Sequence, residues 1–275
     1  MVMAPRVCER DPQRQEMVYS VRPVLRDMTS ASDPLRPHPP LQEYYASEGE
    51  RRRRIVGWFD ESAPDYDWVN RVLSLGSGSR YRREALLAAG LAAGMSHLDV
   101  ACGTGVLAAH AQEIAGPAGQ VVGLDPSAGM LRQAGARGVR RRVIGVAEAL
   151  PFPDGRFDRL SMGYALRHVA DLRTTFREYR RVLKPGGRVL ILEITPPASR
   201  LHHSLLAFYM GRVLPLLARF GRGGRTSRVL MEYFWETIET CVPPPVILGA
   251  LEEAGFQSVE RRVQMGILSE YTAVR

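Results

Sequence analysis

Short apolar segments alternate with amphipathic segments over most of the chain after residue 96. Apolar runs of about four to eight residues predict strands, and apolar residues spaced three or four apart predict helices. The predicted strands are "HLDVA" (97–101), "QVVGLD" (120–125), "RRVIGV" (141–146), part of "RFDRLSMGYA" (156–165) and "RVLILEIT" (188–195). The predicted helices are 105–116, 126–138 starting with Pro126, and 171–183 capped by Asp171, with "KPGG" (184–187) as a turn. This alternation indicates a parallel sheet with helices on both faces.

The chain on either side of this core extends the α/β prediction. Residues 55–75 have a helical pattern that Pro64 should break, and residues 79–90 predict a helix ending at Gly90. Residues 244–274 predict one helix and two strands joined only by a short "MG" link. So tight a link makes the last pair of strands an antiparallel hairpin at the edge of the sheet.

Residues 1–50 differ from the rest of the chain. Hydrophobic periodicity is poor there, and 7 of the 19 prolines precede Leu41, which predicts a mostly disordered leader. Its acidic residues argue against a transit peptide, and it lacks the apolar core of a signal peptide. "RRRR" at 51–54 follows, and we favour a solvated helix start over a patch that contacts lipid.

Composition and charge narrow the class of protein. The chain has 275 residues, a formal charge of +8 and a pI of about 9.8. Three widely spaced cysteines, Cys8, Cys102 and Cys241, favour neither a disulfide framework nor a metal cluster. Because no run of about 18 apolar residues occurs, we expect a cytoplasmic protein. The basic balance fits either attraction to a membrane surface or simple solubility, and no nucleic-acid motif is present.

The stretch "LDVACGTG" (98–105) places two glycines directly after the first core strand. Ligands of open parallel sheets bind beyond the carboxyl ends of the strands, so this turn makes room for one. Asp99 would repel the pyrophosphate of a dinucleotide and instead favours a cation such as an ammonium group. Asp125 ends the second strand, where an acid commonly accepts hydrogen bonds from ribose hydroxyls. An ammonium and a ribose together describe S-adenosylmethionine; the alternative is that both acids are strand-end caps.

Four stretches resemble successive motifs of class I S-adenosylmethionine-dependent methyltransferases: "LDVACGTG", "VVGLDPSAGML", "AEALPFPDGRFD" and "RVLKPGGRVLILE". "WFDESAPDYDWVNRVLSLG" and "YALRHV" further resemble the UbiE-type family, which C-methylates the rings of ubiquinone and menaquinone precursors. The resemblance runs from about residue 55 to 275. It implies a Rossmann-like fold with a seven-stranded, mostly parallel sheet, one methyltransferase domain over 51–275, and a substrate-recognition insertion at about 199–245.

The resemblance also implies a set of cofactor contacts. The expected cofactor-binding residues are Asp99, Gly103, Thr104, Gly105, Asp125, Pro126, Met130, Val146, Ala147 and Gly163. Thr104 would line the methionine part, Val146 and Ala147 the adenine, and Met130 the nucleoside, unless Met130 is only a core residue. The family usually has Asn at the position of Val146 and Ser at that of Gly163.

"YALRHV" would open onto the methyl end of the cofactor. A ring carbon becomes a far better nucleophile when a ring hydroxyl loses its proton, which requires a base and a cation. The family has Arg-Asn here, thought to position a water, whereas this chain has Arg167 and His168. We expect Arg167 to stabilise the oxyanion and His168 to accept the proton, directly or through water. The alternative is that Arg167 pairs with an acid such as Asp60 or Asp67 and His168 only caps a helix.

Further positions could serve the substrate. Tyr66 and Tyr164 are expected to line its pocket or to be core residues, and Asp60, Asp67 and Asn70 to close a lid. The apolar stretch 199–221 would form a wall for an isoprenoid tail, or a core helix kinked near Pro215. With the net charge, it predicts peripheral contact with the inner membrane, and a homodimer is a further expectation.

The leading hypothesis is methylation of a ring carbon of a quinone precursor or similar aromatic or prenylated compound. Three others stay open. One is O-, N- or C-methylation of an unrelated metabolite, another is a cofactor-binding relative with different quinone chemistry, and the third is a binding factor without turnover.

Overall fold

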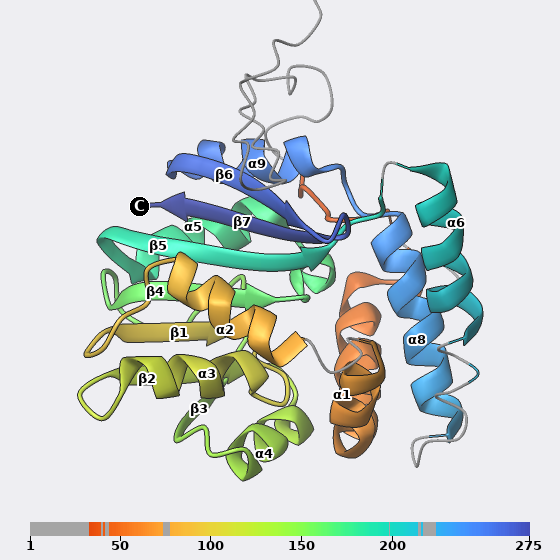
Figure 1. The fold of residues 1–275 in the computed structure, drawn as a ribbon, viewed down its shortest axis with the longest axis horizontal. Helices are drawn as coiled ribbons and strands as arrows, with labels where there is room; N and C mark the ends of the chain where they lie inside the picture. Colours follow the sequence, from red (N-terminus) through yellow and green to blue (C-terminus); the bar gives the residue numbers. More distant parts are fainter. Residues whose placement is uncertain are drawn as a thin grey trace, which may run out of the picture.

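A seven-stranded sheet with strand order β3-β2-β1-β4-β5-β7-β6 forms the centre of the molecule (Figure 1). The computed structural model describes residues 33–39, 41, 44–73, 78–197, 199–213, 216 and 224–275. The strands are β1 Ser96–Val100, β2 Gln120–Asp125, β3 Arg141–Ile144, β4 Phe157–Gly163, β5 Leu183–Ile194, β6 Gln257–Gln264 and β7 Leu268–Val274. β1 to β5 pair in parallel. The mostly parallel α/β architecture predicted from the sequence is therefore confirmed.

The C-terminal hairpin closes one edge of the sheet, as predicted. β7 inserts between β5 and β6 and runs antiparallel to both. The link at Met265 and Gly266 has positive φ at both residues, 52° and 74°, as the central positions of a tight hairpin turn require.

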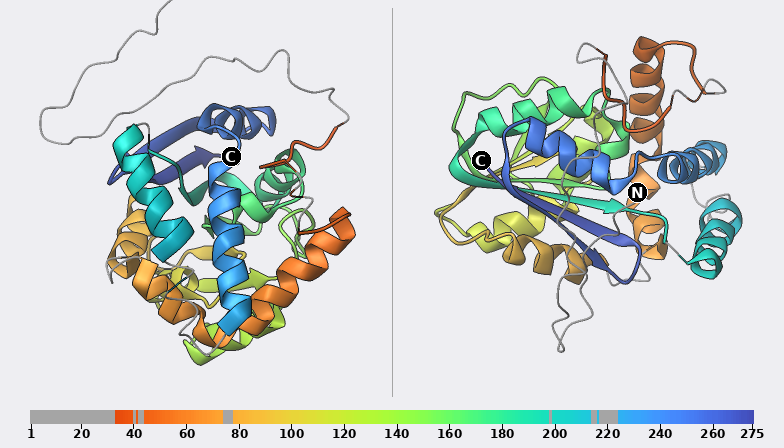
Figure 2. Two further views of the ribbon diagram at one scale, coloured as in Figure 1. Left: turned by 90° about the vertical axis from the view of Figure 1, so that its right-hand side faces the viewer. Right: turned by 90° about the horizontal axis from the view of Figure 1, so that it is seen from above.

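Two helical layers cover the sheet (Figure 2). α2 (Gly78–Ala88) and α3 (Val106–Ala115) lie on one face and share a hydrophobic core with α4 (Ala128–Ala136). α5 (Leu172–Val182) and α9 (Pro244–Glu253) lie on the other face and pack on the second core. Asp171 caps α5 as predicted, because its carboxylate accepts hydrogen bonds from the main-chain N–H groups of Arg173 and Thr174.

A third group of helices stands beyond the carboxyl ends of the parallel strands (Figure 1). It comprises α1 (Glu48–Leu73), α6 (Arg200–Phe208) with a π-helical turn at Tyr209–Val213, and α8 (Gly224–Glu239). Among the described residues, no helix is long and apolar enough to cross a membrane. Asp67, Asn70 and Pro215, singled out from the sequence, have side chains outside the described part of the chain.

The predicted break at Pro64 is wrong, because α1 continues through it. Proline has no N–H, so the carbonyl of Asp60, four residues earlier, loses its usual helical donor. That part of α1 packs closely on α4: a Cβ added to Gly129 would lie 3.0 Å from the Asp60 carbonyl oxygen. Contact with α4 therefore holds the helix together where the local sequence disfavours it.

Three smaller predictions also differ from the structure. Pro126 precedes α4 rather than starting it, because Ser127 is the N-cap. The "KPGG" segment belongs to β5, which begins at Leu183 through pairing with Phe157. Residues 33–39 of the expected leader pack on the domain: Leu35 donates to the Asp171 carboxylate at 2.9 Å, and the N–H of Val242 donates to Pro37. Residues 1–32 lie outside the described residues.

Candidate active site

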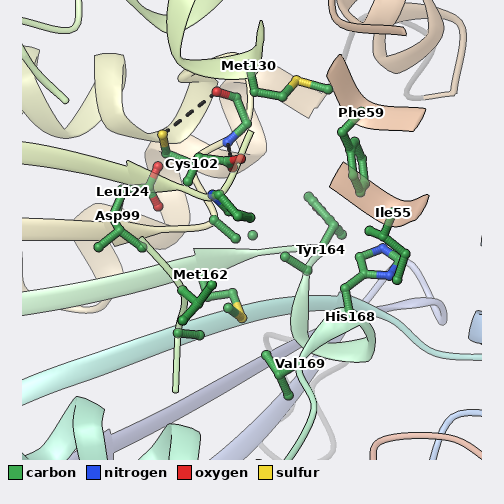
Figure 3. Close-up of a pocket in the computed structure, with 18 of the residues that line it drawn as sticks. Ile55, Phe59, Asp99, Cys102, Leu124, Met130, Met162, Tyr164, His168 and Val169 are labelled. Carbon is green, nitrogen blue, oxygen red and sulfur yellow. Dashed lines mark hydrogen bonds between the residues drawn. The ribbon is translucent and has the colours of Figure 1, made fainter. Parts of the chain in front are cut away.

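A deep cavity opens at the carboxyl ends of β1, β2 and β4 and is covered by α1 (Figure 3). It encloses about 1230 Å³ of space, including its mouth. The lining includes most residues predicted from the sequence: Tyr66, Asp99, Gly103, Thr104, Asp125, Pro126, Met130, Val146, Ala147, Gly163, Tyr164 and His168. Gly105 and Arg167 do not line it. Asp99 and Cys102 lie at one end of the cavity, and Phe59 and His168 at the other (Figure 3).

The glycine turn after β1 shapes the first end of the cavity. Gly103 and Gly105 both have positive φ, 54° and 79°, which favours glycine. The Gly103 N–H donates to Asp125 at 2.8 Å. A Cβ on Gly105 would come within 2.9 Å of both Val139 and Ala134, so Gly105 permits close packing of α3 on α4 rather than facing the cavity.

Asp125 lies at the end of β2 with both carboxylate oxygens held by main-chain donors. Gly103 N–H binds one oxygen and Ser127 N–H the other, each at 2.8 Å. Burial raises the pKa of Asp125 to about 6. The side chain is fixed in orientation and lines the cavity, so it can accept further hydrogen bonds from a ligand such as vicinal hydroxyl groups.

Asp99 is the most buried acid of the cavity and is part of a chain of side chains. Ser161, its partner in the β1–β4 register, donates to Asp99 Oδ1 at 2.6 Å. His97 Nε2 lies 2.9 Å from the same hydroxyl oxygen. Asp99 Oδ2 has no hydrogen-bond partner within the described residues. Burial raises the pKa of Asp99 to about 7.

The geometry of the hydrogen-bonded series His97–Ser161–Asp99 fixes the positions of its hydrogens when Asp99 is ionised. The Ser161 hydroxyl gives its one hydrogen to Asp99, so His97 must donate from Nε2 to Ser161. Burial lowers the pKa of His97 to about 3, which keeps the ring neutral. Sequence reasoning missed His97 and Ser161. The signal was available: polar residues 97 and 99 alternate along one face of a buried strand.

An acid from α1 fastens the cover of the cavity. Asp60 Oδ1 accepts hydrogen bonds from the Ser127 hydroxyl and the Gly129 N–H, both at 2.6 Å. These contacts tie α1 to the N-terminal end of α4, two residues beyond Asp125. Asp60 thus holds α1 on α4 beside the cavity, and the lid role expected of it stays a prediction.

The other end of the cavity is aromatic. His168 packs against Phe59, Tyr233 and Phe234 at ring-centroid distances of 5.6, 5.7 and 5.6 Å. Both ring nitrogens of His168 are buried and lack a hydrogen-bond partner in the described chain. Burial, together with the charges of Arg167 and Arg51, lowers the pKa of His168 well below its ordinary value. The imidazole is therefore neutral and has unused hydrogen-bonding capacity beside the cavity.

Arg167 does not reach the cavity, contrary to the expected direct contact with an oxyanion. Its Nη1 donates to Glu193 Oε1 and to the carbonyl of Tyr164, both at 2.7 Å, and its guanidinium lies 4.9 Å from the Phe234 ring centroid. The partner acid is Glu193 rather than Asp60 or Asp67. Tyr164 has a positive φ of 59°, which is strained for a non-glycine residue. Arg167 thus holds a strained segment that lines the cavity.

Arg51 is a cation of the cavity lining that sequence reasoning missed. It is buried and donates to the carbonyl of Val169 at 3.2 Å, whereas Arg52, Arg53 and Arg54 are exposed. The prediction that "RRRR" is a solvated helix start is therefore wrong for Arg51, the first of the four residues. Arg51 lines the cavity beside His168, and Arg82 lines it with its guanidinium 4.9 Å from the Tyr164 ring centroid.

Two tyrosines predicted to face the substrate line the cavity. Burial raises the pKa of Tyr66 and of Tyr164 to about 12, so both phenols stay protonated at neutral pH. The Tyr66 ring lies 5.8 Å from Phe59 and 6.4 Å from Phe234, which adds it to the aromatic end.

The sheet order, the glycine turn after β1 and the acids in β1 and at the end of β2 define a class I S-adenosylmethionine-dependent methyltransferase. Solved structures share the fold. A SAM-dependent methyltransferase from Thermotoga maritima matches with a TM-score of 0.56 at 18% identity, over 79% of this chain and 98% of that one. The phosphoethanolamine N-methyltransferase 2 of Haemonchus contortus, in complex with S-adenosyl-L-methionine, matches with a TM-score of 0.56 at 17% identity, over 78% of this chain and 57% of that one.

Sequence comparison gives the family. The model of the ubiE/COQ5 methyltransferase family matches residues 47–275. A ubiquinone/menaquinone biosynthesis C-methyltransferase UbiE from Geobacter sulfurreducens is 35% identical over 232 residues, covering 81% of this chain and 89% of the relative. A demethylmenaquinone methyltransferase from Thermus thermophilus is 36% identical over 222 residues, covering 79% and 99%. The chain belongs to the ubiE/COQ5 methyltransferase family, and S-adenosylmethionine is its methyl donor.

Proposed function

We propose that this methyltransferase modifies a ring carbon of a quinone precursor or a similar aromatic, prenylated molecule. One observation carries the proposal: a single cavity has two acids at one end and an aromatic wall with an unpartnered histidine at the other. The names of the relatives from Geobacter sulfurreducens and Thermus thermophilus support a quinone precursor as the substrate.

The acidic end fits the cofactor. The unpartnered Asp99 Oδ2 suits an ammonium group, and the fixed carboxylate of Asp125 suits ribose hydroxyls. We infer that Thr104 lies along the methionine part, Met130, Val146 and Ala147 along the nucleoside, and Pro126 and Gly163 at the remaining walls. Bound S-adenosylmethionine supplies an electrophilic methyl group on a sulfonium.

The aromatic end fits a hydroxylated ring. Phe59 and Tyr66 offer flat apolar contacts, and α1 excludes water from above. His168 accepts the hydrogen bond of a ring hydroxyl and takes its proton, directly or through water. An imidazolium alone would be unfavourable there. It becomes acceptable when a phenolate forms beside it, and the cation of Arg51 or Arg82 stabilises that phenolate. Arg167 positions Tyr164 from outside the cavity.

Contact with a membrane is part of this proposal, because a prenylated precursor dissolves in lipid. The homodimer, the absence of a nucleic-acid partner and a cytoplasmic location stay predictions.

The test uses methyl-labelled S-adenosylmethionine, the purified full chain and a lipid extract from cells that lack quinone methylation. The proposal expects label on a ring carbon in the quinone fraction, and none with the Asp99→Asn variant. If binding of the cofactor is intact and the quinone fraction stays unlabelled, the acceptor is another metabolite. The departures at Val146, Gly163 and His168 would then be the first positions to examine.

A further inference from the structure

α6 presents an exposed apolar stripe. Leu201, Leu205 and Phe208 are 68%, 57% and 61% exposed, and their spacing of four and three residues places them on one side of the helix. No residue of α6 is fully buried. Leu216, which follows the π-helical turn, is 56% exposed. So many large apolar side chains in one short segment indicate a surface that meets an apolar partner.

The opposite side of α6 is already used for packing within the domain. Leu206 packs with Trp235 around Ile238 of α8, and His203 lies 3.4 Å from Glu239 at the end of α8. α6 is the outermost helix of the group beyond the strand ends (Figures 1 and 2). The apolar stripe is therefore left uncovered by the described part of the chain.

The charge of the sequence around α6, residues 194–231, favours an anionic partner. Residues 194–231 contain six of the chain's 37 Lys and Arg and none of its 29 Asp and Glu. The segment thus contributes +6 to a formal net charge of +8. Arg200 and Arg212, which flank the apolar stripe, are both exposed. An apolar stripe bordered by arginines, without a single acid, has the composition of a helix that lies in the plane of an anionic bilayer surface.

Other occupants fit less well. A nucleic acid would attract the arginines but leave Leu201, Leu205 and Phe208 in water. A second copy of the chain would bring another segment with a formal charge of +6 against the first. An anionic bilayer accepts both the apolar and the cationic groups.

We propose that α6 and the turn after it dock on an anionic lipid bilayer, with Leu201, Leu205 and Phe208 inserted below the headgroups and Arg200 and Arg212 at the level of the phosphates. This deepens the function proposed above, on which its biological sense rests. The lipid contact itself needs no turnover and can be tested alone.

The experiment measures sedimentation of the purified full chain with vesicles of phosphatidylcholine, with and without phosphatidylglycerol. Three variants are compared with the unchanged chain. Leu201→Ser/Leu205→Ser/Phe208→Ser removes the apolar stripe, and Arg200→Gln/Arg212→Gln removes two flanking charges. Leu87→Ser/Ile144→Ser removes apolar side chains that are 43% and 65% exposed on α2 and β3, as the matched control.

We expect the chain to bind the anionic vesicles only. Salt at 0.5 M should weaken this binding, because the screening length of exposed charges falls from about 10 Å at 0.1 M to about 3 Å at 1 M. The triple variant should lose at least about tenfold in affinity. The arginine variant should lose several-fold, mainly at low salt, and the control should bind like the unchanged chain. Titration with S-adenosylmethionine shows whether each variant is folded.

Three results would overturn the proposal. One is equal vesicle binding by the triple variant. Another is that the unchanged chain binds no vesicles and is a dimer in light scattering, whereas the triple variant is a monomer. That result would identify a second copy as the occupant. The third is tight binding to a DNA duplex in place of vesicles. Failure of ring methylation with normal vesicle binding would reject the proposed substrate and leave this surface unaffected.

Discussion

His168 is the residue on which the proposed chemistry depends most. Its pKa is lowered, so the imidazole is neutral throughout the neutral pH range and does not titrate there. A base of this kind gains its proton only when the phenolate forms beside it. The rate should therefore be nearly independent of pH between about 6.5 and 8 as far as His168 is concerned.

Replacing His168 by Ala should lower kcat by about a hundredfold or more, because a positioned proton acceptor is lost. Affinity for S-adenosylmethionine should be unchanged, since His168 lies at the aromatic end. Steady-state kinetics with calorimetric titration of the cofactor measures both. His168→Asn, which restores the residue usual in the family, should recover activity through water. Full turnover of the Ala variant at every pH would exclude His168 as the base.

Arg167 and Glu193 form a buried ion pair, and we expect this pair to hold Tyr164 in position. Arg167→Met leaves the Glu193 carboxylate buried without its partner, which should cost about 3–5 kcal/mol of folding free energy. Arg167→Met/Glu193→Leu should recover much of that loss. Denaturant unfolding gives the free energies, and KM measured beside kcat separates positioning from catalysis. If the folded double variant shows a collapse of kcat with unchanged KM, Arg167 acts on the reacting atoms.

At the scale of elements, the contact between α1 and α4 holds one wall of the cavity in place. Gly129 lies so close to α1 that an added Cβ would be 2.8 Å from Asp60 Oδ1 and 3.0 Å from the Asp60 Cα. The backbone of α1 must therefore move if Gly129 is enlarged.

Gly129→Ala should displace α1, weaken cofactor binding several-fold and speed amide hydrogen exchange in α1, at an overpacking cost of about 1–3 kcal/mol. Gly57→Ala is the matched control in α1, because a Cβ there meets nothing within 4 Å. That control should leave binding unchanged and raise stability by up to about 1 kcal/mol. Equal exchange rates in both variants would show that α1 is not held at Gly129.

For the whole molecule, binding of the cofactor and protonation are linked through Asp99. Burial raises the pKa of Asp99 in the folded, ligand-free protein to about 7. The protonated carboxyl therefore stabilises the folded protein at low pH, and this stabilisation is lost as pH rises through 7. An ammonium ligand needs the ionised form. Binding of S-adenosylmethionine should thus tighten as pH rises from 5.5 to 7.5, by up to about tenfold per pH unit below 7.

Calorimetric titration over this pH range checks the linkage. Asp99→Asn should bind weakly and without this pH dependence. His97→Leu removes the donor to Ser161 and should weaken cofactor binding several-fold with little change in kcat, whereas His97→Gln keeps a donor. A pH profile of Asp99→Asn identical to that of the unchanged chain would assign the dependence to another group, such as Asp125.

The sequence predicts the sheet and much of the cofactor end of the site, because these depend on local signals. Short apolar runs, the glycines at 103 and 105, and acids within or at the end of strands can be read without knowing the fold. The errors arise where distant segments meet. α1 passes Pro64 because α4 supports it, Arg51 is buried by packing near residue 169, and Arg167 turns to Glu193 on β5. No local pattern encodes these contacts.

The fastening of α1 by Asp60 has a consequence for the pace of the reaction cycle. Two short hydrogen bonds hold this cover on α4, and any movement of α1 away from α4 as spent donor leaves must break them. Opening is then a step of the cycle separate from bond making. An enzyme with such a step slows in viscous solution to the extent that opening is slow, and it accumulates in its product-bound form when spent donor is abundant.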